Sequence, residues 1–318
     1  MSKVIALPER KFWLDALRGV AMILVIYGHC VPGWTNFFVF TSPVRMPLFF
    51  AISGYLFNPR GGCLLGFFRS ILLKLVIPWL VLGLFPYTHP IDRLLNLLSG
   101  KVLWFMPCLI IAEILWFFVH KYSKSTLQVF CLGILLSATG FALAYFNALN
   151  YARINTAFIA QGFFVIGCLI RLNENRLERR WRLWVSAAVI IYLLLCFITL
   201  FLFPGLSIDV HLNRYYNLPI CIILIAIGLT TLFTLFRVKS FAPTWLVYIG
   251  QNTLIIYIMH GFVLIAMNKC LSVIGLATMS IPIKALINTS IACIVCCCLA
   301  FFANKYVPEI VGKKRSVK

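Results

Sequence analysis

Ionisable side chains interrupt the long apolar segments of this 318-residue chain at only a few positions. The first apolar segment carries Asp15 and Arg18, and His29 follows eleven residues after Arg18. Residues three apart lie on one face of a helix, so Asp15 and Arg18 are expected to pair and to lower each other's cost of leaving water. His29 is the candidate general base, because a neutral imidazole costs little in lipid and accepts a proton near neutral pH.

The positions of these residues along their segments predict their depth in a membrane. With a helical rise of about 1.5 Å per residue, Arg18 lies ~8 Å and His29 ~24 Å from the start of the first segment. Arg45 is expected one turn inside the far surface, and His260 ~22 Å along the ninth segment. His29, Arg45 and His260 are therefore expected to share the outer half of the membrane.

A second set of ionisable residues is expected nearer the cytoplasm. Arg69 and Lys74 begin the third segment near the level of Asp15 and Arg18, and Glu113 falls near the middle of the fourth. Ionisable residues inside a membrane are costly and mark substrate pathways. The two sets predict a site that receives an anionic ligand from the cytosol and acts near the other face.

The elements that must hold these residues are helices in lipid. Hydrophobic residues make up 62% and charged residues 11% of the chain, whereas a soluble globular protein has about 45–50% and about 25%. This composition excludes a soluble fold. We predict an all-α polytopic membrane helix bundle of about ten transmembrane helices, forming a single domain over 1–318 with its core at about 10–306. The predicted spans are approximately 13–31, 42–58, 67–86, 102–120, 126–147, 154–171, 182–203, 216–236, 244–267 and 282–304.

Basic residues predict the orientation of these spans. Lys and Arg gather in the segments on the N-terminal side of the membrane, including Lys3, Arg10, Arg60, Lys239 and the stretches 171–182 and 313–318. Such segments face the cytoplasm, so both termini are predicted there. The net charge of +20 is explained in the same way, and no nucleic-acid partner is expected because no basic stripe is present.

Other reactive side chains have structural explanations. Most of the twelve cysteines lie in apolar runs, and the C-x-x-C spacing within 293–298 has no second pair, so no metal is expected. His211 lies in a loop and receives no role.

Several strings, in this order and spacing, carry a resemblance to a known family. They are Leu14-Asp15-Ala-Leu-Arg18-Gly19, in which ten residues separate Arg18 from His29, Arg45-Met-Pro47-Leu-Phe-Phe-Ala-Ile-Ser53-Gly54-Tyr55, Phe68-Arg69 to Lys74-Leu-Val-Ile-Pro78-Trp79, Leu103-Trp104-Phe105-Met-Pro107 with Glu113, and Ile249-Gly250-Gln-Asn252-Thr-Leu-Ile-Ile-Tyr257-Ile-Met-His260. From residue 10 to about 303 the chain resembles the acyltransferase-3 family, bacterial multi-pass membrane enzymes that O-acetylate sugars of surface glycans. Within that family it is most similar to the fucose 4-O-acetylase group.

The resemblance implies a donor, a location and a donor site. The donor is acetyl-CoA, bound from the cytosolic side of the bacterial inner membrane, with its phosphates suited to Arg18, Arg69 or Lys74. Family members often carry two arginines three apart on the third helix, where this chain offers an arginine and a lysine. A lysine binds phosphate as a point charge rather than through two parallel hydrogen bonds.

The resemblance also implies an acceptor site for a hydroxyl of a cell-surface or lipid-linked glycan. His29 takes the hydroxyl proton, Arg45 holds the acceptor or stabilises the tetrahedral intermediate, and Ser53 positions a hydroxyl. Glu113 and His260 are the two candidates to orient His29. Direct attack and a two-step route through an acetyl-histidine are equally open, and Cys30 is a less favoured nucleophile.

Two non-catalytic classes compete with this interpretation. A transporter or flippase of lipid-linked sugars also places charges at mid-membrane, but it more often has inverted repeats or broken helices, which the sequence does not indicate. A scaffold descended from an acyltransferase is expected to have lost His29 or Arg18, and both are present. The sequence does not identify the acceptor sugar or the oligomeric state.

Overall fold

The structure is a computed structural model that describes residues 10–31, 36–58, 63–84, 89–203, 208–238, 241–273 and 280–313. Its elements are α1 (Phe12–Cys30), α2 (Asn36–Leu56), α3 (Leu64–Ile71), the π-helical turn η2 (Leu72–Val76), α4 (Ile77–Leu84), α5 (Pro90–Leu98), α6 (Phe105–Tyr122), α7 (Thr126–Tyr145), the 3-10 turn η3 (Tyr151–Arg153), α8 (Ile154–Leu172), α9 (Glu174–Leu202), β1 (Ile208–Asp209), β2 (Arg214–Tyr215), α10 (Leu218–Val238), α11 (Thr244–Gln251), α12 (Thr253–Val273), α13 (Ile281–Tyr306) and the 3-10 turn η5 (Pro308–Val311). Lys3, Arg60, Lys239 and residues 314–318, which contribute to the predicted orientation, lie outside the described residues.

The predicted all-α membrane bundle is confirmed. Among the described residues, nine helices are long and apolar enough to cross a membrane. The predicted second span corresponds to α2, which has 21 residues but is not one of these nine. It contains Pro43 and Pro47 within the helix, and its polar residues include Ser42 and Arg45. The remaining predicted spans overlap the nine helices.

The predicted ninth span is wrong as one continuous helix. α11 ends at Gln251, and α12 begins at Thr253 after a break at Asn252. The Asn252 side chain explains the break: its amide donates to the Tyr248 carbonyl, and its oxygen accepts hydrogen bonds from Asn304 and Lys313. An asparagine that bonds its own helix backbone competes with the helical ladder.

The third span is also irregular. The helix from Leu64 to Leu84 contains a π-helical turn at Leu72–Val76, which includes Lys74. Single π turns within α-helices occur frequently near functional sites. The side chain of Lys74 is exposed, so this turn does not direct it into the bundle.

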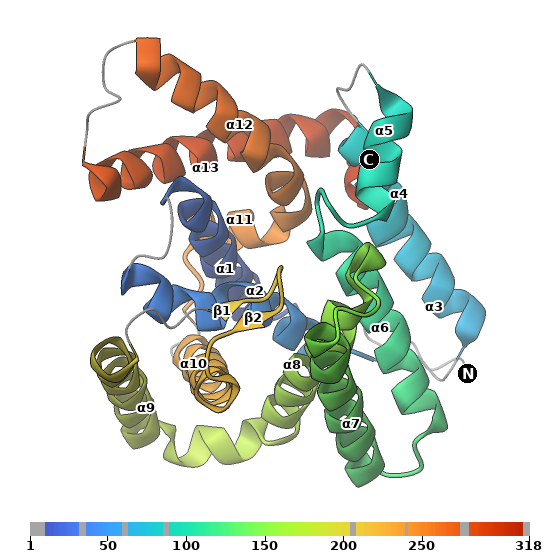
Figure 1. Cartoon of the computed structure of the whole chain (residues 1–318), viewed down its shortest axis with the longest axis vertical. Coiled ribbons are helices and arrows are strands. Elements are labelled where there is room, and N and C mark those ends of the chain that lie inside the picture. The colour runs from blue at the N-terminus through green and yellow to red at the C-terminus, as the bar shows by residue number, and fades with distance from the viewer. Residues whose placement is uncertain are drawn as a thin grey trace, which may run out of the picture.

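α1 lies at the centre of the bundle and packs against α2, α11 and α13 (Figure 1). Close approach between α1 and α11 depends on glycine, because a Cβ on Gly250 would meet the backbone of Asp15 and one on Gly19 would meet that of Leu246. Small residues allow helix backbones to approach closely in membrane proteins. This contact places the end of α11 beside Asp15 at the start of α1.

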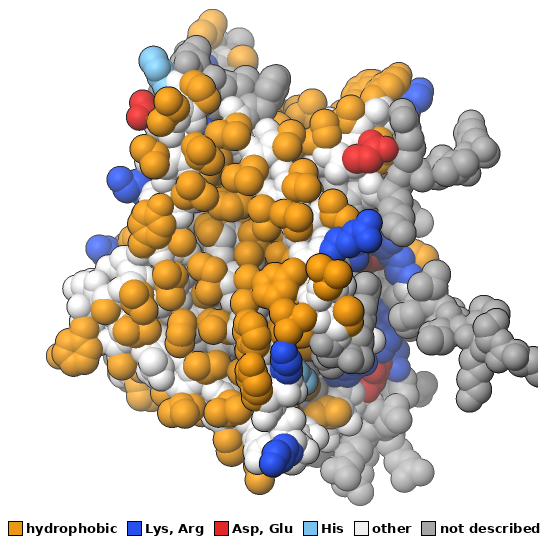
Figure 2. Space-filling model, turned by 90° about the vertical axis from the view of Figure 1, so that its right-hand side faces the viewer, with side chains coloured by type: hydrophobic (Ala, Val, Ile, Leu, Met, Phe, Trp, Pro, Cys, Tyr) orange, Lys and Arg blue, Asp and Glu red, His pale blue; other side chains and the backbone are white. Residues whose placement is uncertain are grey.

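The flanks of the bundle are apolar. Figure 2 shows one flank, on which hydrophobic side chains cover most of the surface and charged side chains lie mainly toward the margins. Large exposed hydrophobic residues such as Leu65, Ile134 and Phe201 lie on α3, α7 and α9. These surfaces suit contact with lipid chains rather than water.

The connections predicted at 87–101 and 204–215 contain ordered structure. The first includes α5, and the second includes the antiparallel pair of β1 and β2, with Ile208 opposite Tyr215 and Asp209 opposite Arg214. This hairpin brings polar side chains over the C-terminal end of α1, where the site is formed.

Candidate active site

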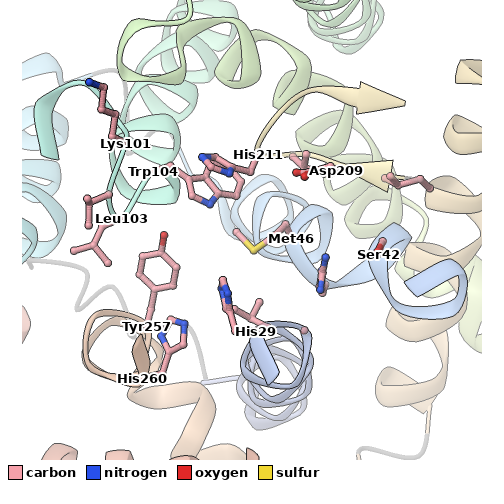
Figure 3. A pocket seen from close by; sticks show the side chains of 16 residues that line it. His29, Ser42, Met46, Lys101, Leu103, Trp104, Asp209, His211, Tyr257 and His260 are labelled. Atoms are coloured by element: carbon pink, nitrogen blue, oxygen red, sulfur yellow. The ribbon is translucent and has the colours of Figure 1, made fainter. Parts of the chain in front are cut away.

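A pocket of about 460 Å³, here called the histidine pocket, lies at the C-terminal end of α1 and brings together His29, Arg45 and His260. The rings of His29 and His260 are 5.2 Å apart between centroids. In Figure 3 these two rings and the phenol of Tyr257 point into the pocket from α1 and α12. Three residues chosen from separate segments of the sequence therefore line one pocket.

His260, rather than Glu113, lies beside His29. The Nδ1 atom of His260 is 3.2 Å from the carbonyl oxygen of Ile256, one turn earlier in α12. With its proton on Nδ1, the ring donates to that carbonyl and keeps Nε2 as an acceptor. Glu113 instead lines two further cavities together with Arg18. Of the two sequence candidates for orienting His29, only His260 has the required position.

Arg45 reaches the histidine pocket because Gly28 lacks a side chain. A Cβ on Gly28 would collide with a terminal guanidinium nitrogen of Arg45. The guanidinium also stacks over the ring of Phe38, with Cζ 4.7 Å from the ring centroid. Among the described residues, Arg45 has no carboxylate within 4.0 Å. Its positive charge is therefore available to a ligand.

The hairpin and the start of α6 form the opposite wall of the pocket. His211 stacks on Trp104 with 5.0 Å between ring centroids, and the Arg153 guanidinium donates to His211 Nε2 over 2.8 Å. Burial, followed by the charge of Arg153, lowers the pKa of His211 to about 4. His211 is therefore neutral at physiological pH and accepts this hydrogen bond. Figure 3 shows Trp104, His211 and Asp209 across the pocket from His29.

Sequence reasoning missed this wall. Asp209 and His211 belong to a short loop, and polar loop residues carry no signal of their own in a single sequence. Ser42 was also missed, although it stands three residues before Arg45 and therefore on the same face of α2. The Ser42–Arg45 spacing is the signal by which Ser42 could have been found.

A series of adjoining cavities runs from the histidine pocket toward the start of α1. The next cavity, about 230 Å³, shares Met46 and Tyr257 with the histidine pocket. It shares Arg18, Ser53 and Glu113 with a third cavity of about 220 Å³. Together these cavities follow α1 from His29 back to Arg18, a separation of about 16 Å along a helix.

The last member of the series is a basic cavity of about 410 Å³ at the start of α1. It shares Arg18, Leu56 and Asn58 with the third cavity. Its cationic lining residues are Arg10, Lys11, Arg18 and Arg171. This concentration of donors suits an anionic ligand with several phosphate oxygens.

The expected pairing of Asp15 and Arg18 is confirmed, and the carboxylate has further partners. Asp15 is buried, lies 3.6 Å from Arg18 and accepts a hydrogen bond of 2.7 Å from Arg10. Gln251, at the end of α11, donates to the same carboxylate over 3.3 Å. Asp15 therefore fixes Arg18 and joins α1 to α11.

Glu174 forms a second anionic centre beside the basic cavity. Its carboxylate accepts hydrogen bonds from Lys11 (2.9 Å) and the Tyr55 hydroxyl (2.8 Å), and it forms an ion pair with Arg237 (2.8 Å). Burial raises the pKa of Glu174, but the hydrogen bonds from Lys11 and Tyr55 and the nearby positive charges outweigh it and hold the pKa below its ordinary value. This cluster joins the starts of α1 and α9 to the ends of α2 and α10.

Arg69 and Lys74 are not brought into this arrangement. Both side chains are exposed, and neither lines the four cavities described above. The residues of α3 that do line the third cavity are Gly66, Phe67 and Ser70. Ser53 lies in the second and third cavities rather than in the histidine pocket.

The four cavities offer charged and polar side chains but no metal-ligand cluster. Within the described residues, no group of three or more His, Cys, Asp or Glu side chains is placed to hold a metal ion.

A family model described as an acyltransferase domain matches residues 11–304, nearly the whole chain. The comparison with curated proteins found no match, and neither did the comparison with solved structures.

Proposed function

The chain belongs to the acyltransferase-3 family, and from this premise we propose that it moves an acetyl group from acetyl-CoA to a hydroxyl of a sugar. The observation that carries this proposal is the series of adjoining cavities, each sharing lining residues with the next, between the basic cavity and His29. Acyl transfer across a membrane requires an anionic carrier at one end and a base beside the acceptor at the other.

The basic cavity is the proposed site for the phosphates of the donor. Arg10, Lys11, Arg18 and Arg171 line it and supply charge-assisted hydrogen bonds. Arg18 also lines the two cavities that lead to His29, which suits an extended arm that carries the thioester. Arg69 and Lys74 are exposed, and in this proposal they contribute only charge near the entrance.

His29 is the proposed general base of the transfer. Its imidazole takes the proton of the sugar hydroxyl while the hydroxyl oxygen attacks the thioester carbonyl carbon. The carbon–sulfur bond of the tetrahedral intermediate then breaks, and the thiolate of coenzyme A receives the proton from the imidazolium. His260 orients His29, and the positive charge of Arg45 serves either the acceptor or the developing oxyanion.

The proposed orientation places the basic cavity at the cytoplasm of a bacterial inner membrane and the histidine pocket at the outer face. The basic residues around the start of α1 favour this orientation. Reporter fusions after Asn173 and after His211 test it and are expected to report cytoplasm and periplasm, respectively. The same signal from both fusions would contradict the orientation.

The decisive experiment measures acetyl transfer by purified protein in lipid nanodiscs. With labelled acetyl-CoA and an extract of surface glycan, His29→Ala is expected to lower the transfer rate by about 10²–10⁴-fold, the usual contribution of a general base. Binding of coenzyme A is expected to remain, because the basic cavity is unchanged. Full activity of His29→Ala would overturn the assignment.

A second candidate function is translocation of a lipid-linked sugar without acyl transfer. The break between α11 and α12 favours it, because transporters build binding sites at discontinuous helices. Two assays of the purified protein separate the two functions. A flippase transfers no label in nanodiscs, but in sealed vesicles it moves the lipid-linked sugar from one leaflet to the other. This movement is expected to be the same in His29→Ala.

A further inference from the structure

The histidine pocket contains a guanidinium that has no ion pair with a described carboxylate; Asp209, which lines the same pocket, acts on it only from beyond 4.0 Å. Within the described part of the chain, Arg45 forms no hydrogen bond or ion pair, and its one ring contact is the face of Phe38. A charged group held partly away from water is costly unless an anion compensates it. The chain thus keeps a positive charge beside the reacting histidine that its own described carboxylates leave unpaired.

A buried hydroxyl lies one turn away on the same face of α2. Ser42 is 3% exposed and lines the histidine pocket, and its Oγ has no hydrogen-bond partner among the described residues. Helical hydroxyls elsewhere in this chain donate to the carbonyl four residues earlier, as Thr139, Thr199 and Thr289 do. A buried hydroxyl that makes no such bond indicates a partner supplied from outside the protein.

The lining of the pocket is positively charged overall. Arg45 and Lys101 carry positive charge, and Asp209 is its one carboxylate among the described lining residues. Asp209 is already engaged, because its side chain accepts a hydrogen bond of 3.0 Å from the backbone N–H of Leu212. Lys101 forms no ion pair with a described residue. With a neutral sugar, two cationic groups would share Asp209 as the one described carboxylate of the pocket, and a positive charge would remain in excess.

We propose that the acceptor is an acidic sugar, whose carboxylate binds the Arg45 guanidinium and the Ser42 hydroxyl. This inference rests on the proposed acetyl transfer and names its substrate class. A planar carboxylate matches the two parallel donors of a guanidinium, and Ser42 supplies a third donor one helical turn away. The acidic group anchors the sugar at α2, so that a hydroxyl elsewhere on the ring faces His29.

The role of Arg45 is then acceptor binding rather than stabilisation of the tetrahedral intermediate. The two roles differ in one measurable respect. A residue that stabilises the intermediate acts on every acceptor, whereas a residue that binds a carboxylate acts only on acceptors that carry one.

The experiment uses pairs of methyl glycosides that differ only in one group, a carboxylate in the glucuronide, galacturonide and mannuronide and a hydroxymethyl group in the corresponding hexosides. Wild-type protein in nanodiscs is expected to transfer acetyl to an acidic member with a kcat/KM roughly 10- to 100-fold above that of its neutral partner. A hexoside 6-phosphate of the same sugar tests whether phosphate replaces the carboxylate. Preference for the phosphate, or for neutral sugars, would overturn the proposal.

Arg45→Gln and Ser42→Ala test the two contacts. Arg45→Gln is expected to lower kcat/KM for the acidic acceptor to that of the neutral one, mainly through KM, and Ser42→Ala is expected to lower it a few-fold. Arg45→Lys is expected to keep part of the preference for the acidic acceptor, since a lysine keeps the positive charge but lacks the two parallel donors of a guanidinium. Arg214→Gln is the matched control, because Arg214 is exposed on β2 and does not line the pocket. An equal loss on acidic and neutral acceptors would overturn the proposed role.

Binding separates this inference from the proposed function. The His29→Ala variant is expected to bind the acidic glycoside, monitored by the fluorescence of Trp104 in the pocket wall, and to lose that binding when Arg45→Gln is added. If wild-type protein binds acidic sugars through Arg45 but transfers no acetyl group, the proposed function fails and the acidic ligand stands. If it acetylates neutral sugars alone, the function stands and the acidic acceptor fails.

Discussion

Arg18 and Arg45 are the same side chain on two neighbouring helices, but their surroundings differ. Arg18 lies beside Asp15, which also binds Arg10 and Gln251. Arg45 lies on the backbone of Gly28 and the ring of Phe38, and no described carboxylate lies within ion-pair distance of it. Arg18 therefore has an ion pair within the protein, whereas Arg45 has only the more distant charge of Asp209 and leaves its guanidinium donors open to a ligand.

The same contrast holds for the regions around these residues. At the basic cavity, Asp15 and Glu174 connect α1, α2, α9, α10 and α11 through ion pairs and hydrogen bonds. At the histidine pocket, the unpaired Ser42 and Arg45 face a cavity instead. Polar groups that form hydrogen bonds and ion pairs with each other stabilise the fold. Polar groups without such partners lower its stability but can bind a ligand. The two ends of the bundle therefore predict different responses to mutation.

The largest effect on stability is expected at the compensated end. Glu174→Gln removes the negative charge between Lys11 and Arg237, which then repel each other without an anion between them. The Glu174 side chain is only 15% exposed, although Lys11 and Arg237 are more open to solvent. We expect a loss of about 2–3 kcal/mol, below the range for fully buried pairs. Unfolding in SDS–detergent mixtures, followed by circular dichroism, measures this loss.

The pH dependence of stability provides the control for Glu174. The folded-state pKa of Glu174 lies below the ordinary value of 4.5, so its ionised form stabilises the fold above that pH. This contribution is lost as the pH falls through the folded-state pKa. Wild-type protein should therefore lose part of its stability as the pH falls from about 4.5, and Glu174→Gln should lack that part of the slope. Identical slopes would show that the cluster contributes nothing to stability.

A smaller effect, on ligand binding, is expected from Arg18. Arg18→Ala should raise the Kd for coenzyme A about tenfold, because one charge-assisted contact to phosphate is lost. Arg45→Ala should leave that Kd unchanged, since Arg45 lines only the histidine pocket of the four cavities. Isothermal titration with coenzyme A compares the two variants. An equal loss of coenzyme A affinity in both variants would contradict the proposed division between the basic cavity and the histidine pocket.

Most helices could be predicted from the sequence, because the length of an apolar run determines whether it spans a membrane. The runs predicted at 126–147 and 154–171 correspond closely to α7 (Thr126–Tyr145) and α8 (Ile154–Leu172). The break at Asn252 could not be predicted, since one asparagine is tolerated in many apolar helices. Here it is stabilised by Asn304 and Lys313, which stand far away in the sequence.

The site could be predicted only where its residues are unusual for their segment. A histidine or an arginine within an apolar helix is costly, so the positions of His29 and Arg18 alone were enough to predict them as site residues. Ser42 is common in helices, and Asp209 is common in loops. Their importance comes from the fold, which places both at the pocket that contains His29. Arg69 and Lys74 were predicted from residue type, level in the membrane and the family resemblance, and none of these indicates whether a side chain faces a cavity; both are exposed in the structure.

The smallest effect is expected from Gly28→Ala, which tests whether the position of the Arg45 guanidinium depends on the absence of a side chain at Gly28. A methyl group at this position would collide with the guanidinium of Arg45 and displace it from the helix backbone. Alanine suits a helix better than glycine, so the fold itself should not be weakened by helix propensity. We expect a fall of a few-fold in kcat/KM for acetyl transfer, with the Kd for coenzyme A unchanged.

Gly261→Ala is the matched control for this change, because a Cβ at Gly261 meets no atom within 4 Å and the residue adjoins His260 on α12. If both variants keep full activity, the position of Arg45 does not depend on Gly28. If Gly28→Ala instead weakens coenzyme A binding as much as transfer, a disturbance at the histidine pocket reaches the basic cavity, and the two ends are coupled through α1. If Gly28→Ala lowers acetyl transfer alone, the basic cavity around Arg18 keeps its geometry while the histidine pocket around Arg45 changes. The difference between the surroundings of Arg18 and Arg45 predicts this result.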